Sequence, residues 1–497
     1  MKSLKSLYDN KVLCITVILL FLVAAYFFAF TSNAYDIIEV SSLWVRKYFG
    51  TFYLYLGLGC VLFLLVIAIS PWGKIKLGRP KEKPAYSRLA WISMLYSAGM
   101  GAGILLRAVQ EPVFMYNNPP LNTGSAPATI ALEFTFYQWG FTAWAFYGLF
   151  ALLIGHAIFK NKLPVSISSI FKHKKSKKSK PYHKAIDVLT LLTTVFGLVS
   201  AVGLGAAQIN GGLNHLMGTT LDYGTIIWLV IGIGILALVS ALSGVDKGIK
   251  RISTLNIYLT VALLVFVFAQ SEIIPVLQSF FNSIYRYIID FIPMSLAMGK
   301  YDPGVDFLTE WTYYYWAFWL AWAPFTGIFI ARISQGRTFR EIIIGTLLIP
   351  SLGTFFWFSV FGQSAFNMIE GWGEYNGEFS DVFSSIFVFL SHYPLNALIN
   401  IVVIVLLVSF LVTSVDSAIY VMGMLSDKGH KHPSRKMRLL WGVLLTLCCV
   451  GIVLLGHARP ESDVLTAVQK LLIVTSLPFA LLMVVMVIAW IRNLIKD

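Results

Sequence analysis

The sequence predicts an all-α polytopic membrane protein with about twelve transmembrane helices. Of its 497 residues, 57% are hydrophobic and only 12% are charged, whereas an ordinary soluble domain has about 45–50% apolar and about 25% charged residues. Apolar runs of about 20 residues, which is the length of a helix that crosses a bilayer, recur along almost the whole chain. Basic residues also gather in every second loop between these runs, as they do in multi-pass membrane proteins.

The apolar segments can be taken in order as separate helices. Residues 12–30 are long enough to span and no small-residue cleavage pattern follows them, so we interpret them as the first membrane helix and not as a signal peptide. Residues 271–293 are too polar to span and predict an amphipathic helix at the outer surface. The other predicted spans are 51–71, 89–116, 130–158, 185–213, 224–243, 252–270, 308–334, 339–362, 396–425, 437–456 and 464–491.

The basic loops predict the orientation of these helices. Lys and Arg residues are densest after the fourth span, in FKHKKSKKSKPYHK, and the alternate loops carry more acidic residues. Because loops rich in Lys and Arg stay in the cytoplasm, we expect a multi-pass protein of the plasma (inner) membrane with both termini cytoplasmic. The net charge of +14 is explained by this orientation, and we expect no nucleic-acid partner.

Composition and motifs exclude several functional classes. The four cysteines lie inside apolar runs, where they are small hydrophobic residues. The eight histidines form no HExxH or comparable ligand set, which argues against an enzyme. Repeated pore elements, which a channel would need, are also lacking. A secondary transporter remains, with a small solute and the lipid bilayer as its partners and no cofactor.

Glycines inside the third span point to a binding region. The run SAGMGAG places Gly99, Gly101 and Gly103 at alternate positions, and transporters often bind solutes and ions where such helices are broken. Close packing of helices through small residues is the alternative interpretation.

Aromatic residues in two spans suggest a cage for a cationic group. Tyr315, Trp319 and Trp322 follow the i, i+4, i+7 spacing of one helix face. Trp139 and Trp144 lie in the fourth span, so two helices could enclose a quaternary ammonium group through cation–π attraction. The rings could also simply pack against one another.

The motifs MLYSAGMGAGILLRAVQEP, SGVDKGIKRIS, YYWAFWLAWAPFTGIFIARISQGRTFRE and LVTSVDSA, in this order and spacing, resemble the betaine/carnitine/choline transporter (BCCT) family. The resemblance implies a leucine-transporter-like core of two inverted five-helix repeats, and a homotrimer. It divides the chain into two extra helices with a basic loop (1–88), a first repeat (89–270), an extracytoplasmic connector (271–306) and a second repeat with a short tail (307–497).

The resemblance also assigns site residues. The aromatic box and its pathway correspond to Trp139, Trp144, Tyr147, Trp316, Trp319 and Trp322. Phe318 departs from the family, which usually carries another tryptophan there. A sodium site corresponds to Ser97, Met100, Phe410, Thr413 and Ser414, and a second sodium site to Thr190, Thr194 and Phe325. Oxygen ligands of these types suit a hard cation, although membrane-helix hydroxyls often bond to their own backbone.

Arg107 is the largest departure from the family, which places an aromatic residue there. A cation near the middle of a span costs roughly 2.5–3.5 kcal/mol on insertion scales, so it should face a cavity or a partner. It could bind the anionic group of the substrate, replace a coupling ion, or pair with an acid, for which Glu133 is the candidate.

The sequence thus predicts an importer of a small quaternary-ammonium or zwitterionic solute such as betaine, choline or carnitine, coupled to Na⁺ and working by alternating access. The alternatives are a carrier of a zwitterion with a stronger anionic head, such as the sulfonate-bearing amine taurine, and a sodium-independent exchanger.

Overall fold

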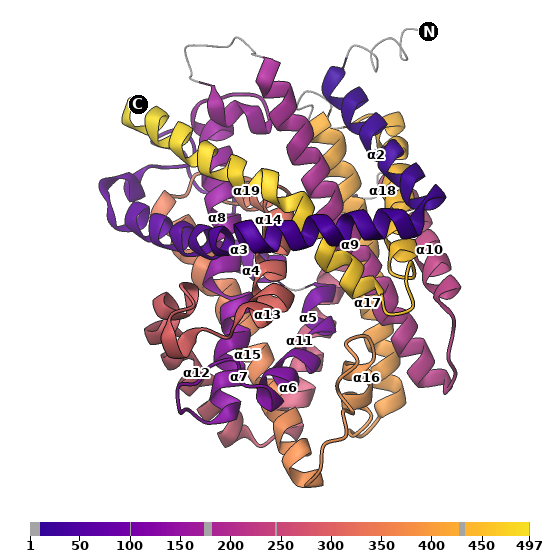
Figure 1. The fold of residues 1–497 in the computed structure, drawn as a ribbon. Coiled ribbons are helices and arrows are strands. Elements are labelled where there is room, and N and C mark those ends of the chain that lie inside the picture. The colour runs from indigo at the N-terminus through magenta and orange to yellow at the C-terminus, as the bar shows by residue number, and fades with distance from the viewer. Residues whose placement is uncertain (1–9, 100, 173–180, 244–245, 427–432, 497) are drawn as a thin grey trace.

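The computed structural model describes residues 10–99, 101–172, 181–243, 246–426 and 433–496 (Figure 1). Within them the chain is helical, with one isolated β-bridge between Lys76 and Thr338. Met100 and most of the Lys-rich loop lie outside the described residues. The helices are α2 (Lys11–Ala29), α3 (Thr31–Ile69), α4 (Arg88–Gly99), α5 (Ala102–Leu106), α6 (Gln110–Asn117), α7 (Pro127–Trp139), α8 (Phe141–Gly155), α9 (Pro181–Met217), α10 (Tyr223–Ser243), α11 (Asp246–Gln270), α12 (Ile273–Ser295), α13 (Val305–Phe307), α14 (Tyr313–Ile333), α15 (Phe339–Trp372), α16 (Ser385–Leu390), α17 (Asn396–Ser426), α18 (Arg435–Leu455) and α19 (Val464–Lys496), with short 3₁₀ or π turns at Pro71–Lys74, His156–Lys160, Ile167–Phe171, Gly299–Tyr301 and Leu308–Thr312.

The predicted all-α membrane architecture is confirmed. Eleven helical segments in the described part of the chain are long and apolar enough to cross a membrane, with α7 and α8 counted together as Pro127–Lys160. They correspond to eleven of the twelve predicted spans. The remaining span, residues 89–116, is present as the three shorter helices α4, α5 and α6.

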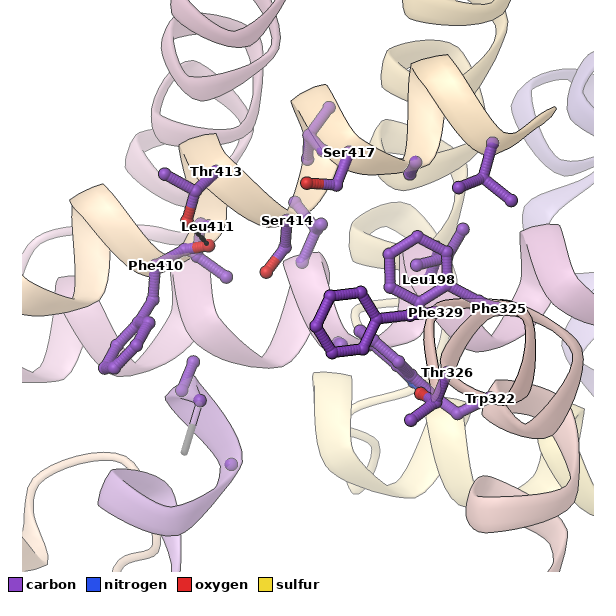
Figure 2. Close-up of a pocket in the computed structure, with 18 of the residues that line it drawn as sticks. Leu198, Trp322, Phe325, Thr326, Phe329, Phe410, Leu411, Thr413, Ser414 and Ser417 are labelled. Carbon is purple, nitrogen blue, oxygen red and sulfur yellow. Dashed lines mark hydrogen bonds between the residues drawn. The ribbon is translucent and has the colours of Figure 1, made fainter. Parts of the chain in front are cut away.

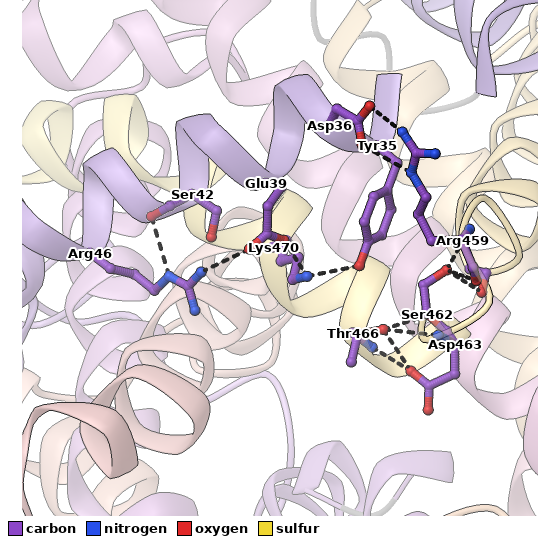
Figure 3. A network of polar contacts seen from close by, with 11 residues as sticks. Tyr35, Asp36, Glu39, Ser42, Arg46, Arg459, Ser462, Asp463, Thr466 and Lys470 are labelled. Atoms are coloured by element: carbon purple, nitrogen blue, oxygen red, sulfur yellow. Dashed lines mark hydrogen bonds and ion pairs between the residues drawn. The ribbon is translucent and has the colours of Figure 1, made fainter. Parts of the chain in front are cut away.

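The predicted start of the second span is wrong. Helix α3 begins at Thr31 and has 39 residues, about 58 Å at 1.5 Å per residue, and it runs across the bundle (Figure 1). Its first part carries charged residues, and a hydropathy criterion does not assign such a segment to a membrane span. Asp36 forms an ion pair with Arg459, and Glu39 forms one with Lys470 (Figure 3). These pairs join the charged part of α3 to the α18–α19 loop and to α19.

The helix breaks lie where glycine is required or favoured. Helix α4 ends at Gly99 and α5 begins after Gly101, so the glycine run does interrupt the span. The fourth predicted span is also broken, between α7 and α8 at Gly140. A Cβ on Gly140 would come within 2.6 Å of the Phe355 ring, so a larger residue would force the ring or the break to move.

The polar segment before Pro293 forms the amphipathic helix α12. Its buried residues include Ser283, Tyr287 and Asp290, and large apolar side chains such as Phe281 and Ile288 are exposed. Its buried face packs against α7 and α15. A helix is thus present over the predicted segment, and its Tyr287 contacts Phe141 at the break between α7 and α8.

Candidate functional site

A cavity of about 830 Å³ lies between the broken segment α5 and helices α8, α9, α14 and α17. Figure 2 shows aromatic side chains of α14 facing hydroxyl groups of α17 across it. The predicted site residues that line this cavity are Ser97, Arg107, Trp139, Trp144, Tyr147, Phe318, Trp319, Trp322, Phe325, Phe410, Thr413 and Ser414. Residues that are up to 317 positions apart in the sequence, from 97 to 414, therefore share one cavity.

The predicted aromatic cage forms part of the cavity wall. The ring centroids of Trp139 and Trp319 are 5.1 Å apart, and those of Tyr147 and Trp319 are 6.1 Å apart. Trp144 packs edge-on against Tyr147 at 5.4 Å. The Trp319 indole N–H donates to the Gln138 carbonyl at 2.9 Å, which fixes α14 to the end of α7. The rings of α7, α8 and α14 thus form one surface.

Phe318 and Trp322 extend this wall along α14. Their rings stack at 6.1 Å, and the Trp322 indole N–H donates to the Gly197 carbonyl at 3.1 Å. A Cβ on Gly197 would lie 2.9 Å from the Ala321 side chain. The close approach of α9 and α14 therefore requires glycine at this position.

Trp316 does not line the cavity. It is fully buried and packs against Tyr137 and Phe146, with ring centroids 5.1 and 6.4 Å away. Its side chain packs against α7 and α8 outside the cavity, so in this conformation it supports the wall from behind.

Arg107 caps the C-terminal end of α5 and is 4% exposed. Its guanidinium donates to the Gln110 Oε1 atom at 2.6 Å and lies 4.9 Å from the Trp311 ring centroid. It also interacts electrostatically with Glu111. The suggested pairing with Glu133 is wrong, because the Glu133 carboxyl instead faces Asp290 of α12.

Glu111 is a functional candidate that the sequence interpretation missed. It is fully buried, accepts the Trp139 indole N–H at 3.2 Å, and accepts a hydrogen bond from the Tyr315 hydroxyl. It therefore connects Arg107 to the cage. The available signal was its place as the one acidic residue of the apolar run 89–116, since acids in membrane spans are functional candidates by default.

Oxygen-bearing residues of α17 form the opposite side of the cavity. Phe410, Thr413 and Ser414 face it together in Figure 2. The Thr413 hydroxyl donates to the carbonyls of Ser409 at 2.9 Å and Phe410 at 3.1 Å, and its oxygen keeps lone pairs for a cation. Asp416 also lines the cavity and accepts from the Ser240 hydroxyl at 2.8 Å, so it is a second missed acid.

The residues of the second predicted sodium site are not together around this cavity. The Thr190 and Thr194 hydroxyls donate to backbone carbonyls one turn earlier, at 2.9 and 2.7 Å. Phe325 lines the cavity, and the two threonines do not.

Comparison with known proteins gives a consistent result. A family profile described as BCCT, betaine/carnitine/choline family transporter, matches residues 11–497. The chain is 36% identical over 467 residues to the glycine betaine transporter OpuD of Bacillus subtilis, covering 93% of this chain and 90% of that one. It is 35% identical over 459 residues to the betaine/ectoine transporter LcoP of Corynebacterium glutamicum, with coverages of 90% and 71%. It is 32% identical over 506 residues to an ectoine/hydroxyectoine transporter of Virgibacillus pantothenticus, with coverages of 99% and 98%.

Proposed function

The chain belongs to the betaine/carnitine/choline transporter family, and on that premise we propose that it imports a small zwitterionic quaternary-ammonium solute, with glycine betaine as the first candidate. Its family and relatives are transporters and not enzymes. The relatives named above carry betaine or ectoine according to their descriptions. Both solutes have a cationic nitrogen and a carboxylate, which supports a zwitterion as the solute of this chain.

The arrangement of the cavity wall carries this proposal. Trp139, Tyr147 and Trp319 present adjoining rings, and a methylated ammonium group is attracted to such faces by roughly 0.5–2 kcal/mol per ring. Arg107 lines the same cavity and can donate charge-assisted hydrogen bonds to a carboxylate or sulfonate. A cationic and an anionic group on one solute therefore have complementary partners. The Arg107 position also supports a sulfonate-bearing amine as the second candidate.

Uptake into proteoliposomes tests the proposal. Labelled glycine betaine should accumulate with saturable kinetics, and unlabelled glycine betaine should compete better than choline, which lacks an anionic group. Stronger competition by taurine than by glycine betaine would favour the sulfonate alternative. Uptake that does not saturate, or none for any of these solutes, would contradict a carrier of this class.

We also propose that import is coupled to Na⁺. The support is that Ser97, Phe410, Thr413 and Ser414 line the cavity that holds the cage, and oxygen ligands are those that hard cations prefer. An inward Na⁺ gradient should drive accumulation that an equal K⁺ gradient does not. Equal transport without Na⁺, dependent on solute inside the vesicle, would instead establish a sodium-independent exchanger.

The orientation and assembly are proposed on the same basis. We propose that the protein lies in the plasma membrane with cytoplasmic termini and forms a homotrimer. Single cysteines replacing Lys81 and Glu374, in a chain without its native cysteines, should react with an impermeant maleimide from opposite sides of the membrane. The mass of the purified protein, corrected for detergent by light scattering, should equal three chains.

A further inference from the structure

Two carboxyl groups meet between α7 and the connector helix α12, away from the cavity. Glu133 of α7 is fully buried, and Asp290 of α12 is 4% exposed. The Glu133 carboxyl lies within hydrogen-bonding reach of the Asp290 carboxyl. Two ionised carboxylates repel each other, and burial in a medium of low dielectric constant makes each charge costly unless a positive group is present.

The hydrogen bonds around this pair leave three oxygen atoms unsatisfied. The Tyr301 hydroxyl donates to the Asp290 Oδ1 atom at 2.7 Å. If both carboxyls are ionised, the two Glu133 oxygens and the Asp290 Oδ2 atom, three buried atoms in all, accept no hydrogen bond, because a carboxylate cannot donate to another carboxylate. Two such groups facing each other in a buried site need a proton or a bound cation between them.

Protein cations do not fill this role among the described residues. The nearest is Arg286, which interacts electrostatically with Glu133 from an exposed position on α12. Neither Glu133 nor Asp290 takes part in an ion pair in the described part of the chain. Arg286 thus lowers the local negative potential without contacting the three oxygens.

The number of unsatisfied oxygens favours a metal ion over a shared proton. One proton held between two carboxyl groups serves two oxygen atoms, and the third would remain without a partner. A hard metal cation can contact all three, because Na⁺ and Ca²⁺ take several oxygen ligands at once. The hydroxyl of Tyr137, one helical turn from Glu133, and that of Ser295 lie beside each other and add oxygen atoms on the same two helices. We propose that Glu133 and Asp290 bind a hard metal cation, Na⁺ or Ca²⁺, that joins α12 to α7.

A cation at this position would stabilise the packing of the connector helix α12 against α7. Helix α7 continues from Glu133 to Trp139 of the cage and ends at Gly140. Directly after that break, the Phe141 backbone N–H donates to the Tyr287 hydroxyl of α12 at 2.9 Å. The connector thus holds α7 at the carboxylate pair and α8 at the break. Bound cation would stabilise the wall that carries Trp139, whichever solute is transported.

Thermal unfolding of the purified full-length protein tests the proposal. NaCl and CaCl₂ are titrated separately at constant ionic strength, with N-methyl-D-glucamine chloride as the balancing salt. The unfolding midpoint of the wild-type protein should rise saturably with one of the two cations, because a ligand that binds only the folded state stabilises it. Glu133→Gln and Asp290→Asn, each combined with Thr413→Ala to weaken the proposed coupling site, should abolish the rise. Each should also raise the midpoint measured without the cation, because the charge repulsion is relieved.

Three controls make the result specific. Glu370→Gln changes a carboxylate that accepts from Tyr116 at the protein surface, and this variant should keep the cation response. Thr413→Ala should also keep it, which separates this site from the proposed coupling site. Equilibrium binding of radioactive sodium or calcium to wild-type and Thr413→Ala protein, which should bind the ion of this site equally, gives a measurement that does not depend on the Glu133 and Asp290 variants folding.

Several results would overturn the proposal. A cation response that persists when Glu133→Gln and Asp290→Asn are each combined with Thr413→Ala would place the ion elsewhere. Absence of any response to Na⁺ and Ca²⁺ in the wild-type protein, together with a midpoint that is higher in acidic than in alkaline buffer and loses this dependence in Glu133→Gln, would show a shared proton. Failure of both variants to fold, with no specific binding of either radioactive ion to the wild-type protein, would also refute it.

Discussion

Replacing Trp319 with leucine removes the ring that connects both sides of the cage. Trp319 lies 5.1 Å from Trp139 and 6.1 Å from Tyr147 between ring centroids, and it is 8% exposed. Leucine keeps an apolar side chain at this position but has no aromatic face. The main loss is therefore the attraction between a ring and the ammonium group of the solute.

The size of the effect follows from these contacts. One cation–π contact in a desolvated site contributes up to about 2 kcal/mol, which corresponds to about a 30-fold change in the dissociation constant. The Trp139–Trp319 ring pair contributes a further ~0.5–1.5 kcal/mol to positioning Trp139. We expect Trp319→Leu to raise the dissociation constant for glycine betaine at least about tenfold. The lost hydrogen bond to Gln138 should lower the unfolding midpoint without adding to the affinity change.

Calorimetric titration of purified protein with glycine betaine measures the affinity. Two matched variants serve as controls. Trp319→Phe keeps an aromatic face without the indole N–H, so it should keep most of the affinity. Trp316→Phe changes a tryptophan of the same helix that packs away from the cavity, and it should change the affinity by less than about threefold. Unchanged affinity in Trp319→Leu would refute the cage and leave the rings as packing residues.

Three further predictions concern the charged and oxygen-bearing residues. Arg107→Gln should weaken glycine betaine binding by about 1.5–3 kcal/mol, and equal losses for choline in competition assays would contradict a role in binding the anionic group. Thr413→Ala should raise the Na⁺ concentration for half-maximal accumulation by about tenfold or more, whereas an unchanged Na⁺ dependence would show that this hydroxyl only bonds to its own helix. Lys470→Met removes the ion pair with Glu39 and the bond to Tyr35, so it should lower stability by up to about 1 kcal/mol. That difference in the unfolding midpoint should shrink in high salt, and a salt-independent difference would point to lost packing.

Hydropathy predicts the membrane helices well because lipid requires long apolar runs with an internally bonded backbone. It fails at the start of α3, where Asp36, Glu39 and Arg46 interrupt the apolar run. There the helix is continued by contacts with distant parts of the chain, such as the Asp36–Arg459 and Glu39–Lys470 pairs. Residues 31–50 alone do not predict these contacts, because the partners lie near the other end of the chain.

The cage was predictable to the extent that helical periodicity determines it. Successive residues of an α-helix are about 100° apart, so Tyr315, Trp319 and Trp322 share one face and all three line the cavity. On the same helical wheel Tyr314 and Trp316 lie about 100° from Tyr315 on opposite sides, and Tyr314 lines the cavity whereas Trp316 does not. Which of the two sides faces the cavity depends on how α14 packs against its neighbours, so spacing alone does not exclude Trp316.

The partner of Arg107 could also have been derived from spacing. In a continuous helix, Arg107 and Glu111 would be an i, i+4 pair. Here the helix is interrupted between them, since α5 ends at Leu106 and α6 begins at Gln110, and both side chains are buried beside the cavity. Their opposite charges cancel, which offsets part of the roughly 2.5–3.5 kcal/mol that an arginine costs within a span.

Because Glu111 also accepts from Trp139 and Tyr315, its negative charge lies next to the rings that would hold an ammonium group. A zwitterion adds no net charge to this neutral pair and can place its cationic end toward the rings and its anionic end toward Arg107, whereas a simple cation leaves Arg107 without a new partner.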